Sequence, residues 1–375
     1  MIHAIRHSRH LCVSLVLVFV GPAIARAADA SSNDAATYEK TMNKAVEFLR
    51  IQGQAADGSY SAEAGPGVTA VVTTAILRTG RTSDDPLVAK SLKYLEGFVK
   101  GDGGIYADNS SHQNYETCLA MQCFAAANRD KRYDALLRNA ERYVKGIQWG
   151  ANDGTERSHP AYGGAGYGRS KRPDLSNTSF LLDALKSVGR GSDDEAVQKA
   201  LVFVSRCQNL ETEYNTTPFA SKNPDGGFYY TPAAGGNSQA GATPEGGLRS
   251  YASMTYAGLK SMIFAGLAPD DPRVKAARAW LAQHYTLDEN PGMGSAGLYY
   301  YYQTFARALS TYGEATFVDS AGKKHDWRHD LVTQLARQQK PDGSWVNENA
   351  RWMEGNPNLV TGYALLALDF CRPKP

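Results

Sequence analysis

Three pairs of neighbouring carboxylates are the first residues in this sequence that could carry out acid–base chemistry. Each pair stands directly before an amphipathic stretch that opens with Pro or Glu: Asp84-Asp85-Pro86, Asp193-Asp194-Glu195 and Asp270-Asp271-Pro272. Aspartate at the cap and Pro or Glu in the first turn stabilise a helix start, because they satisfy or replace its free N–H groups. Since the pattern recurs at equivalent places, we predict that these acids cap helices and are not catalytic.

Metal-ligating residue types are present, but their spacing does not favour a metal site. His325 and His329 are four residues apart and could share one helix face, yet no third ligand has helical spacing. Cys118 and Cys123 are five apart on a predicted helix and point about 140° apart, so they cannot pair with each other. We predict neither a metal nor a cofactor, and the pairing of the four cysteines after residue 27 stays open: Cys118, Cys123, Cys207 and Cys371.

One pattern of elements recurs along the chain and must position any such residues. An amphipathic helix, such as LVAKSLKYLEGFVK, runs into a glycine-centred turn, and an almost wholly apolar helix, such as NLVTGYALLAL, follows. The turns fall near Gly58, Gly104, Gly164, Gly227, Gly294 and Gly343, at intervals of 46, 60, 63, 67 and 49 residues. A helix with one polar face lies outside and an all-apolar helix is buried. Six of each, alternating, close most simply into a two-layer ring, so we predict an all-α (α/α)6 toroid in a single domain.

Two further features belong to the predicted inner helices. Hydroxyl residues align at one position in all six: Thr74, Thr117, Ser179, Thr255, Thr304 and Thr361. We predict that each hydroxyl bonds back to a carbonyl one turn earlier, the alternative being that they face a shared cavity.

A Gly-, Ala- and Pro-rich insertion, Thr231–Gly247, precedes the fourth inner helix. It is interpreted as a lid or rim loop over one mouth, with a disordered surface loop as the alternative.

The residues that open the inner helices should line one mouth of the ring. They are rich in Tyr, Asn and Arg, and helix N-termini add free N–H groups and partial positive charge. This set favours a ligand with a polar or anionic end and an apolar or ring surface, although any single tyrosine could simply cover core. The candidate ligand-binding residues are His112, Tyr115, Arg172, Asn177, Arg249, Tyr251, Tyr299, Tyr301, Trp352 and Asn358.

The turn sequences resemble those of a known superfamily. QQKPDGSW at 338–345 and QAADGSY at 54–60 look like the glutamine–tryptophan motifs of squalene–hopene cyclases, with Tyr replacing Trp in the second. The alternation of outer helix, turn and apolar inner helix is similar to the repeats of the terpenoid cyclase and protein prenyltransferase superfamily. The resemblance covers nearly all of the chain after residue 27 and implies an α/α toroid with a lipid or isoprenoid ligand in its central cavity.

The catalytic signatures of that superfamily are degraded here. Squalene cyclases carry Asp-x-Asp-Asp-Thr-Ala at an inner-helix start, and the best match is Asp174-Leu175-Ser176-Asn177-Thr178-Ser179. Ser176 and Asn177 replace the acid and its neighbour, and serine is too weak an acid to protonate a polyene. The resemblance leaves Asp174 as the family-matched acid, with Glu116 as the next candidate. The three zinc ligands of prenyltransferases fall on Tyr251, Ser253 and Val360, which have little or no affinity for zinc.

The first 27 residues are typical of an export signal. Arg6 and Arg9 precede the apolar run Leu11–Val20, and Ala25-Arg26-Ala27 is an A-x-A cleavage site. The run is about half of the roughly 20 residues that a membrane span needs. We therefore predict a secreted or periplasmic protein of residues 28–375, cleaved near Ala27 and without a transmembrane span, with an uncleaved N-terminal anchor as the alternative. Association with a membrane surface stays open.

We predict a small-molecule partner, and the charge of the chain argues against nucleic acid. The leader holds three arginines and no acidic residue, so its removal changes the formal net charge from +2 to −1. A near-neutral chain without a basic run argues against nucleic acid.

Three functions follow for such a protein. The one we favour is a divergent enzyme or binding protein for a lipid or isoprenoid, expected to have a deep aromatic-lined lumen. The second is a periplasmic carbohydrate lyase or hydrolase, expected to have an open groove, with two facing carboxylates if it hydrolyses. The third is a non-catalytic toroid scaffold.

Overall fold

The computed structural model describes residues 1, 22–150, 153–168 and 171–373. The outer helices are α1 (Pro22–Phe48), α3 (Pro86–Glu96), α5 (Asp134–Gly146), α7 (Glu195–Arg206), α9 (Pro272–Gln283) and α11 (Trp327–Gln338). The inner helices are α2 (Pro66–Arg78), α4 (Gln113–Ala127), α6 (Leu175–Ser187), α8 (Ala252–Phe264), α10 (Leu298–Tyr312) and α12 (Pro357–Asp369). Short elements complete the described chain: a π-helical turn at Leu49–Gly53, 3-10 turns at Ala62–Ala64, Ala220–Lys222 and Arg351–Met353, and an antiparallel pair, β1 (Phe317–Val318) and β2 (Lys324–His325).

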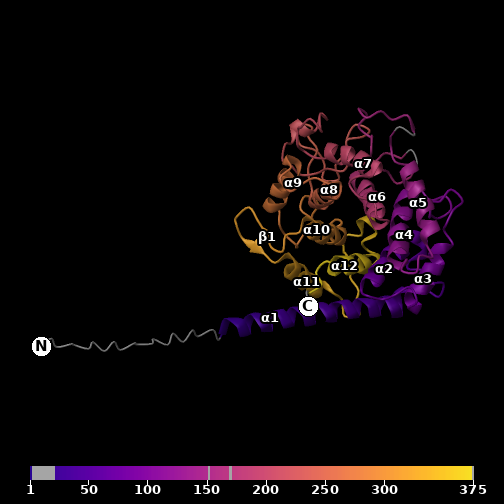
Figure 1. Cartoon of the computed structure of the whole chain (residues 1–375), viewed down its shortest axis with the longest axis vertical. Helices are drawn as coiled ribbons and strands as arrows, with labels where there is room; N and C mark the ends of the chain where they lie inside the picture. Colours follow the sequence, from indigo (N-terminus) through magenta and orange to yellow (C-terminus); the bar gives the residue numbers. More distant parts are fainter. Residues whose placement is uncertain (2–21, 151–152, 169–170, 374–375) are drawn as a thin grey trace.

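The inner helices form a closed ring (Figure 1). Each packs against two inner neighbours, in the order α2, α4, α6, α8, α10, α12 and back to α2. Each also packs against the outer helix that follows it in the chain, and α1 covers α12. The predicted all-α (α/α)6 toroid is therefore confirmed.

Local chemistry explains where these helices start. Asp85, Asp194 and Asp271 accept the backbone N–H two residues ahead and cap α3, α7 and α9. This confirms that the carboxylate pairs build helix starts. The inner helices are buried on all sides, as in α2, where every residue from Pro66 to Leu77 is buried. Such a helix is stable only inside a second layer, and the outer helices provide that layer.

Glycine is required at two of the turns because each of them lies directly against the next outer helix. Gly343 has φ +94°, and a Cβ there would overlap the Lys44 carbonyl of α1. Gly163 has φ +82°, and its Cβ would overlap the Lys199 carbonyl of α7. A side chain would meet both left-handed strain and a backbone clash at these positions.

A glutamine near the end of an outer helix ties each of four repeats to the next. The Nε2 atoms donate to backbone carbonyls of the following outer helix: Gln54 to Leu87 at 2.7 Å, Gln148 to Ala196 at 3.0 Å, Gln208 to Arg273 at 2.8 Å and Gln339 to Thr41 at 2.9 Å. Three of these amides also hold the glycine turn: Gln148 donates to the Gly163 carbonyl, Gln208 to that of Gly226 and Gln339 to that of Gly343.

Five inner helices use one threonine to hold the turn before them. These turn-binding threonines accept the N–H of a turn residue: Thr69 from Tyr60, Thr117 from Ile105, Thr178 from Ala165, Thr255 from Phe228 and Thr361 from Trp345. The predicted hydroxyl column was therefore out of register at Thr74 and Ser179, whose repeats place Thr69 and Thr178 at the equivalent site. The predicted bond to an earlier carbonyl is present at Thr74, which donates to Ala70 O at 2.7 Å.

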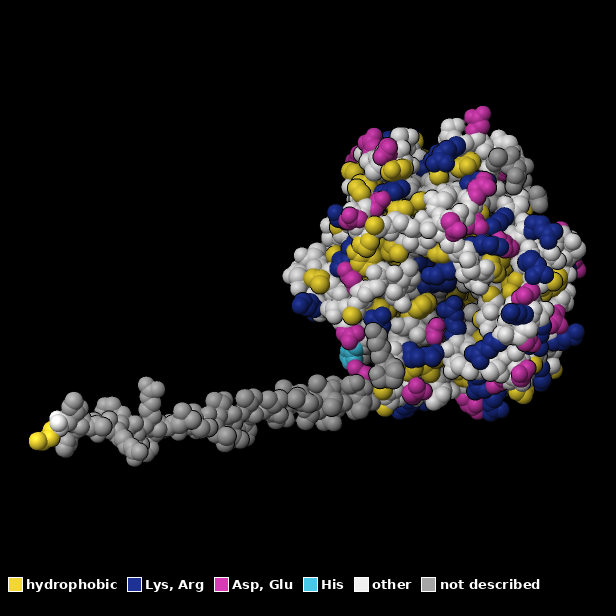
Figure 2. All heavy atoms as spheres, viewed as in Figure 1, with side chains coloured by type: hydrophobic (Ala, Val, Ile, Leu, Met, Phe, Trp, Pro, Cys, Tyr) yellow, Lys and Arg dark blue, Asp and Glu magenta, His cyan; other side chains and the backbone are white. Residues whose placement is uncertain are grey.

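Residues 2–21 of the predicted signal peptide lie outside the described chain, and α1 runs through the predicted cleavage site at Ala27. Its cleavage stays a prediction. All four cysteines after it are free and buried. Among the described residues, no helix combines the length and apolarity that crossing a membrane requires. The face in Figure 2 mixes basic and acidic side chains over the described part of the ring, without one continuous basic stripe.

Candidate functional site

A cavity of about 270 Å³ lies at the mouth where the inner helices begin. All six inner helices contribute to its wall, and the rim loops add Tyr167, Tyr230, Gln239, Trp352 and Met353. Gln239 belongs to the insertion Thr231–Gly247, so the prediction of a rim loop is confirmed. Its Oε1 accepts a 2.6 Å hydrogen bond from Arg351, which joins the two sides of the rim.

The lumen is built in layers that follow from helix geometry. Residues two before, two after and five after the turn-binding threonine share one helix face, because they are spaced i, i+4 and i+7. The upper tier is Gly67, Tyr115, Ser176, Ser253 and Leu359; the middle tier is Val71, Leu119, Phe180, Ala257 and Tyr363; the lower tier is Thr74, Gln122, Asp183, Lys260 and Leu366. Helix α10 has no turn-binding threonine and supplies Tyr300, Thr304 and Arg307 at the same spacing.

Four rings form an aromatic floor beneath the cavity. Tyr115 meets Phe180 edge-on with ring centroids 5.1 Å apart, and Tyr300 lies 6.1 Å from both Phe180 and Tyr363. The Tyr115 and Tyr363 hydroxyls are 3.3 Å apart. Phe180, Tyr300 and Tyr363 each line both the upper cavity and a smaller cavity below it, so the floor separates the two spaces.

Two carboxylates stand on the upper wall, and both are engaged in holding the fold. Glu116 accepts hydrogen bonds from Ala107 N at 2.9 Å and Ser110 Oγ at 2.8 Å. Glu354 accepts the N–H groups that open α10, including that of Tyr300 at 2.8 Å, and burial raises its pKa. Both carboxylates thus satisfy loop or helix-start donors.

Asp174 lies behind this wall as the cap of α6. Its carboxylate accepts Asn177 N at 2.8 Å and Asn177 Nδ2 at 2.7 Å, and the residue is 1% exposed. Burial raises the pKa of Asp174 to about 6. Ser176 is the residue that reaches the cavity, where its Oγ lies 3.0 Å from the Tyr300 hydroxyl. These contacts are those of a helix cap, and a catalytic role for Asp174 stays a prediction.

The structure brings only some of the candidate ligand-binding and catalytic positions to the cavity wall or its rim. On the wall are His112, Tyr115, Glu116, Tyr251 and Trp352. His112 packs edge-on against Tyr167 at 4.8 Å, and Trp352 is 44% exposed at the rim with φ +54°. Off the wall, Arg172 lies over the Tyr230 ring, exposed Arg249 binds the Ala242 carbonyl, and Asn177 holds Asp174.

Three more candidates point into the packing between helices. Tyr299 donates to Gln338 Oε1 at 3.3 Å, and Tyr301 donates to the Thr286 carbonyl at 2.6 Å. Tyr300 between them faces the lumen, because successive helix residues are rotated by about 100°. Asn358 donates to Ser61 Oγ at 3.0 Å and joins α12 to the first turn.

Sequence reasoning predicted Tyr115 of the aromatic floor but missed its other three rings and the charged residues of the lower tier. Phe180, Tyr300 and Tyr363 were not among the predicted site residues, and neither were Asp183, Lys260 and Arg307. The i, i+4, i+7 spacing from the turn-binding threonines carries this signal, but the predicted hydroxyl column was out of register on α2 and α6. Charged residues inside otherwise apolar helices would then have stood out.

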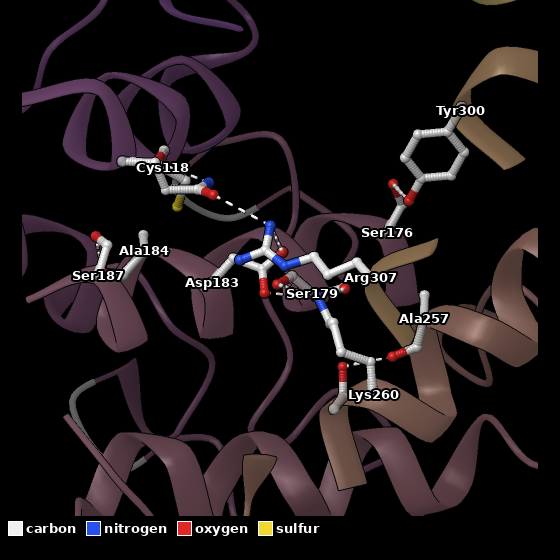
Figure 3. A network of polar contacts seen from close by, with 12 residues as sticks. Cys118, Ser176, Ser179, Asp183, Ala184, Ser187, Ala257, Lys260, Tyr300 and Arg307 are labelled. Atoms are coloured by element: carbon white, nitrogen blue, oxygen red, sulfur yellow. Dashed lines mark hydrogen bonds and ion pairs between the residues drawn. The ribbon is translucent and has the colours of Figure 1, made fainter. Parts of the chain in front are cut away.

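The lower tier contains a buried ion cluster, drawn in Figure 3. Asp183 Oδ1 lies 2.6 Å from Lys260 Nζ, and Asp183 Oδ2 lies 2.9 Å from Arg307 Nη1. Lys260 also donates to Ser179 Oγ at 2.7 Å. Burial lowers the pKa of Lys260 to about 8. Within the described residues, no group of three or more His, Cys, Asp or Glu side chains is placed to hold a metal ion.

Known proteins resemble this chain in fold and not in sequence. No protein-family model and no curated protein sequence matches it. The apo type II terpene cyclase MstE from Scytonema superposes with a TM-score of 0.51 at 16% identity, covering 89% of this chain and 98% of that one. A glycosidase variant also gives a TM-score of 0.51, at 13% identity, covering 92% and 99%. At such identities the likeness concerns the fold alone. The chain therefore has the (α/α) toroid fold that a type II terpene cyclase and a glycosidase also adopt.

Proposed function

We propose that this protein binds a small amphipathic molecule of the isoprenoid or lipid type in the upper cavity. The observation that carries the proposal is the aromatic floor: Tyr115, Phe180, Tyr300 and Tyr363 close the cavity from below. A space that aromatic rings close from below, with few polar groups on its wall, suits an apolar body whose polar end is oriented by those groups.

The volume sets the size of the ligand. A volume of roughly 10–15 Å³ is enough for one water-sized particle, so a cavity of about 270 Å³ has room for on the order of twenty such particles. This is enough for a ten-carbon prenyl chain. Geraniol, a ten-carbon prenyl alcohol, is therefore a probe that fits the cavity.

The wall chemistry favours binding over cyclisation. Ser176 occupies the cavity position where the resemblance would place a strong acid, and the buried cap Asp174 lies behind it. Serine does not protonate an alkene. In this proposal the ligand is held without being protonated.

A carbohydrate is the second candidate, because Glu116 and Glu354 both stand on the wall and Trp352 is exposed at the rim. Glycoside hydrolysis needs one carboxyl to act as acid and a second to act as base or nucleophile. Both carboxylates here accept hydrogen bonds from loop or helix-start groups. Carbohydrate binding is therefore the competing outcome of the binding experiment.

The test is isothermal titration of the purified chain with geraniol and, separately, with the disaccharide cellobiose. Geraniol should bind and cellobiose should not. Trp352→Ala should weaken geraniol binding roughly tenfold, the equivalent of about 1.4 kcal/mol. Trp149→Ala is the matched control, because Trp149 donates to the Lys171 carbonyl away from the cavity wall. Binding of cellobiose without geraniol would replace the isoprenoid proposal with the carbohydrate one.

The proposal includes export of the protein. We expect the protein to bind its ligand outside the cytoplasm, after cleavage near Ala27. N-terminal sequencing of the protein from the exported fraction should begin at Ala28. If the exported protein keeps its first 27 residues, these residues are an N-terminal anchor instead of a cleaved signal.

A further inference from the structure

The lower tier holds an excess of positive charge in the centre of the ring. Lys260 and Arg307 face the single carboxylate of Asp183, and their side chains are only 7%, 12% and 6% exposed. The next cation, Arg78, is paired with Asp369 at 3.5 Å. Arg372 shares that carboxylate at 3.2 Å, so Asp369 brings no spare negative charge to the lower tier. Lys260 and Arg307 share the one carboxylate of Asp183, and the cluster of described side chains therefore has one more positive charge than negative.

Such an excess is costly in a buried site, where an unmatched charge loses its hydration. Figure 3 shows Asp183 between the two cationic side chains, which come from α8 and α10. Hydroxyl and amide groups complete the cluster. Ser179 accepts from Lys260, and Gln122 Oε1 accepts from Arg307 Nη1 at 3.3 Å. These neutral acceptors lessen the cost of the unmatched charge and do not neutralise it.

Space for a small ligand is present beside the cluster. Two cavities of about 10 and 20 Å³ lie below the aromatic floor, and Arg307 and Gln303 line both of them. A volume of roughly 10–15 Å³ is enough for one water-sized particle. The lower lumen thus has room for a monatomic ion, or for one oxygen of a carboxylate.

Gln303 gives an independent indication that a polar ligand belongs there. The side chain is 5% exposed, faces both small cavities and forms no hydrogen bond within the described part of the chain. An amide that faces a small cavity and has no protein partner can be satisfied there by a bound polar particle. Together with the ammonium of Lys260 and the guanidinium of Arg307, the amide N–H groups of Gln303 make a set of donors around a small space.

We propose that the lower lumen is a monoanion-binding site formed by Lys260, Arg307 and Gln303. The anion has two possible sources with the same chemistry. One is a free water-sized ion such as chloride. The other is the carboxylate end of the amphipathic ligand, which reaches the site when Phe180 and Tyr300, the rings shared by the two spaces, turn aside. Only this second source rests on the proposed function.

The free-ion arm measures thermal unfolding during a chloride titration at constant ionic strength, with gluconate, which is too large for the site, as the replacement anion. A ligand that binds only the folded state raises its melting temperature in a saturable way. The wild type should show this response, and Lys260→Met should lose it. Asp183→Asn should strengthen it, because it removes the competing carboxylate. Lys275→Met, at an exposed lysine of α9, is the control and should behave as wild type.

The tethered arm compares geranic acid with geraniol, which differ in the group at one end. If the carboxylate reaches the cluster, the acid should bind roughly tenfold tighter than the alcohol, because hydrogen bonds between charged groups are the stronger ones. Lys260→Met should abolish that preference while geraniol affinity stays unchanged. Gln303→Leu keeps the charges of Lys260 and Arg307 and should reduce the preference for the acid over the alcohol. It serves as a second test of the site if Lys260→Met fails to fold.

The two measurements distinguish a free anion from a ligand carboxylate. A chloride response alone assigns the site to a free ion, and a Lys260-dependent preference for the acid assigns it to the ligand. Equal chloride responses in wild type and Lys260→Met, together with equal affinities for acid and alcohol, would overturn the anion site. If neither prenyl compound binds, the proposed function fails while the chloride arm still decides on the site.

Discussion

Gln339 donates from its side-chain amide to the backbone carbonyl of Thr41, 2.9 Å away and 298 residues earlier in the chain. The bond joins the end of α11 to α1 and so ties the last repeat to the first. Because Gln54, Gln148 and Gln208 make the equivalent bond between consecutive repeats, one device both propagates the ring and closes it.

Removing that device should loosen the ring at its closure. Gln339→Ala leaves the Thr41 and Gly343 carbonyls without this donor, and we expect a loss of about 1–2 kcal/mol in the free energy of unfolding. Urea unfolding followed by circular dichroism measures it. Gln208→Ala, which removes the same two contacts inside the ring, should cost a similar amount. A change below about 0.5 kcal/mol in both would mean that the glutamines carry no net stability.

The turn glycine should tolerate no side chain. Gly343→Ala forces a Cβ into the Lys44 carbonyl at φ +94°, so we expect a loss of at least about 2 kcal/mol in unfolding free energy. Gly322→Ala is the matched control, since Gly322 has φ +80° with open space around its Cβ and should show the left-handed strain alone. Equal losses of unfolding free energy in the two variants would show that close packing against Lys44 does not matter.

Trp345 and Trp352 should separate stability from binding. Trp345 is fully buried and donates to the Leu335 carbonyl of α11 at 2.9 Å, so Trp345→Ala should cost roughly 3–5 kcal/mol. Trp352 is 44% exposed at the rim, so Trp352→Ala should cost much less stability while weakening geraniol binding. Chemical denaturation of both variants is the measurement. A larger stability loss at Trp352 would reverse the assignment of structural and binding faces.

The buried cap Asp174 should make stability depend on pH in an unusual direction. Its folded-state pKa of about 6 lies above the ordinary value of 3.8, so between these values the folded protein binds more protons than the unfolded chain. Stability from this group is therefore full below about pH 4 and falls as the pH rises to about 6, by on the order of 3 kcal/mol.

Asp174→Asn should remove that fall, which urea unfolding at pH 4.5 and pH 7 can measure against wild type. Asp271 provides a control of opposite sign, because hydrogen bonds from Arg273 lower its pKa. Its contribution is present above the unfolded pKa and is lost as the pH falls through the folded pKa. An identical pH profile for wild type and Asp174→Asn would show that this carboxyl has an ordinary pKa in the folded protein.

The sequence by itself determined the layers of this protein. The spacing of apolar residues, the helix caps and the turn glycines each depend on only a few neighbouring residues. The alternation of half-polar and apolar helices could therefore be predicted from local sequence, and it predicted the toroid. The same local logic identified Asp85, Asp194 and Asp271 as caps and the insertion Thr231–Gly247 as a rim loop.

Only the tertiary structure decided which side chains face the lumen. A shift of one residue rotates a helix position by about 100°, which is why Tyr300 lies on the wall while the predicted Tyr299 and Tyr301 pack outward. The ion cluster is beyond local reasoning altogether. Asp183, Lys260 and Arg307 are on three helices and meet because the ring closes, so their charge balance exists only once the chain has folded.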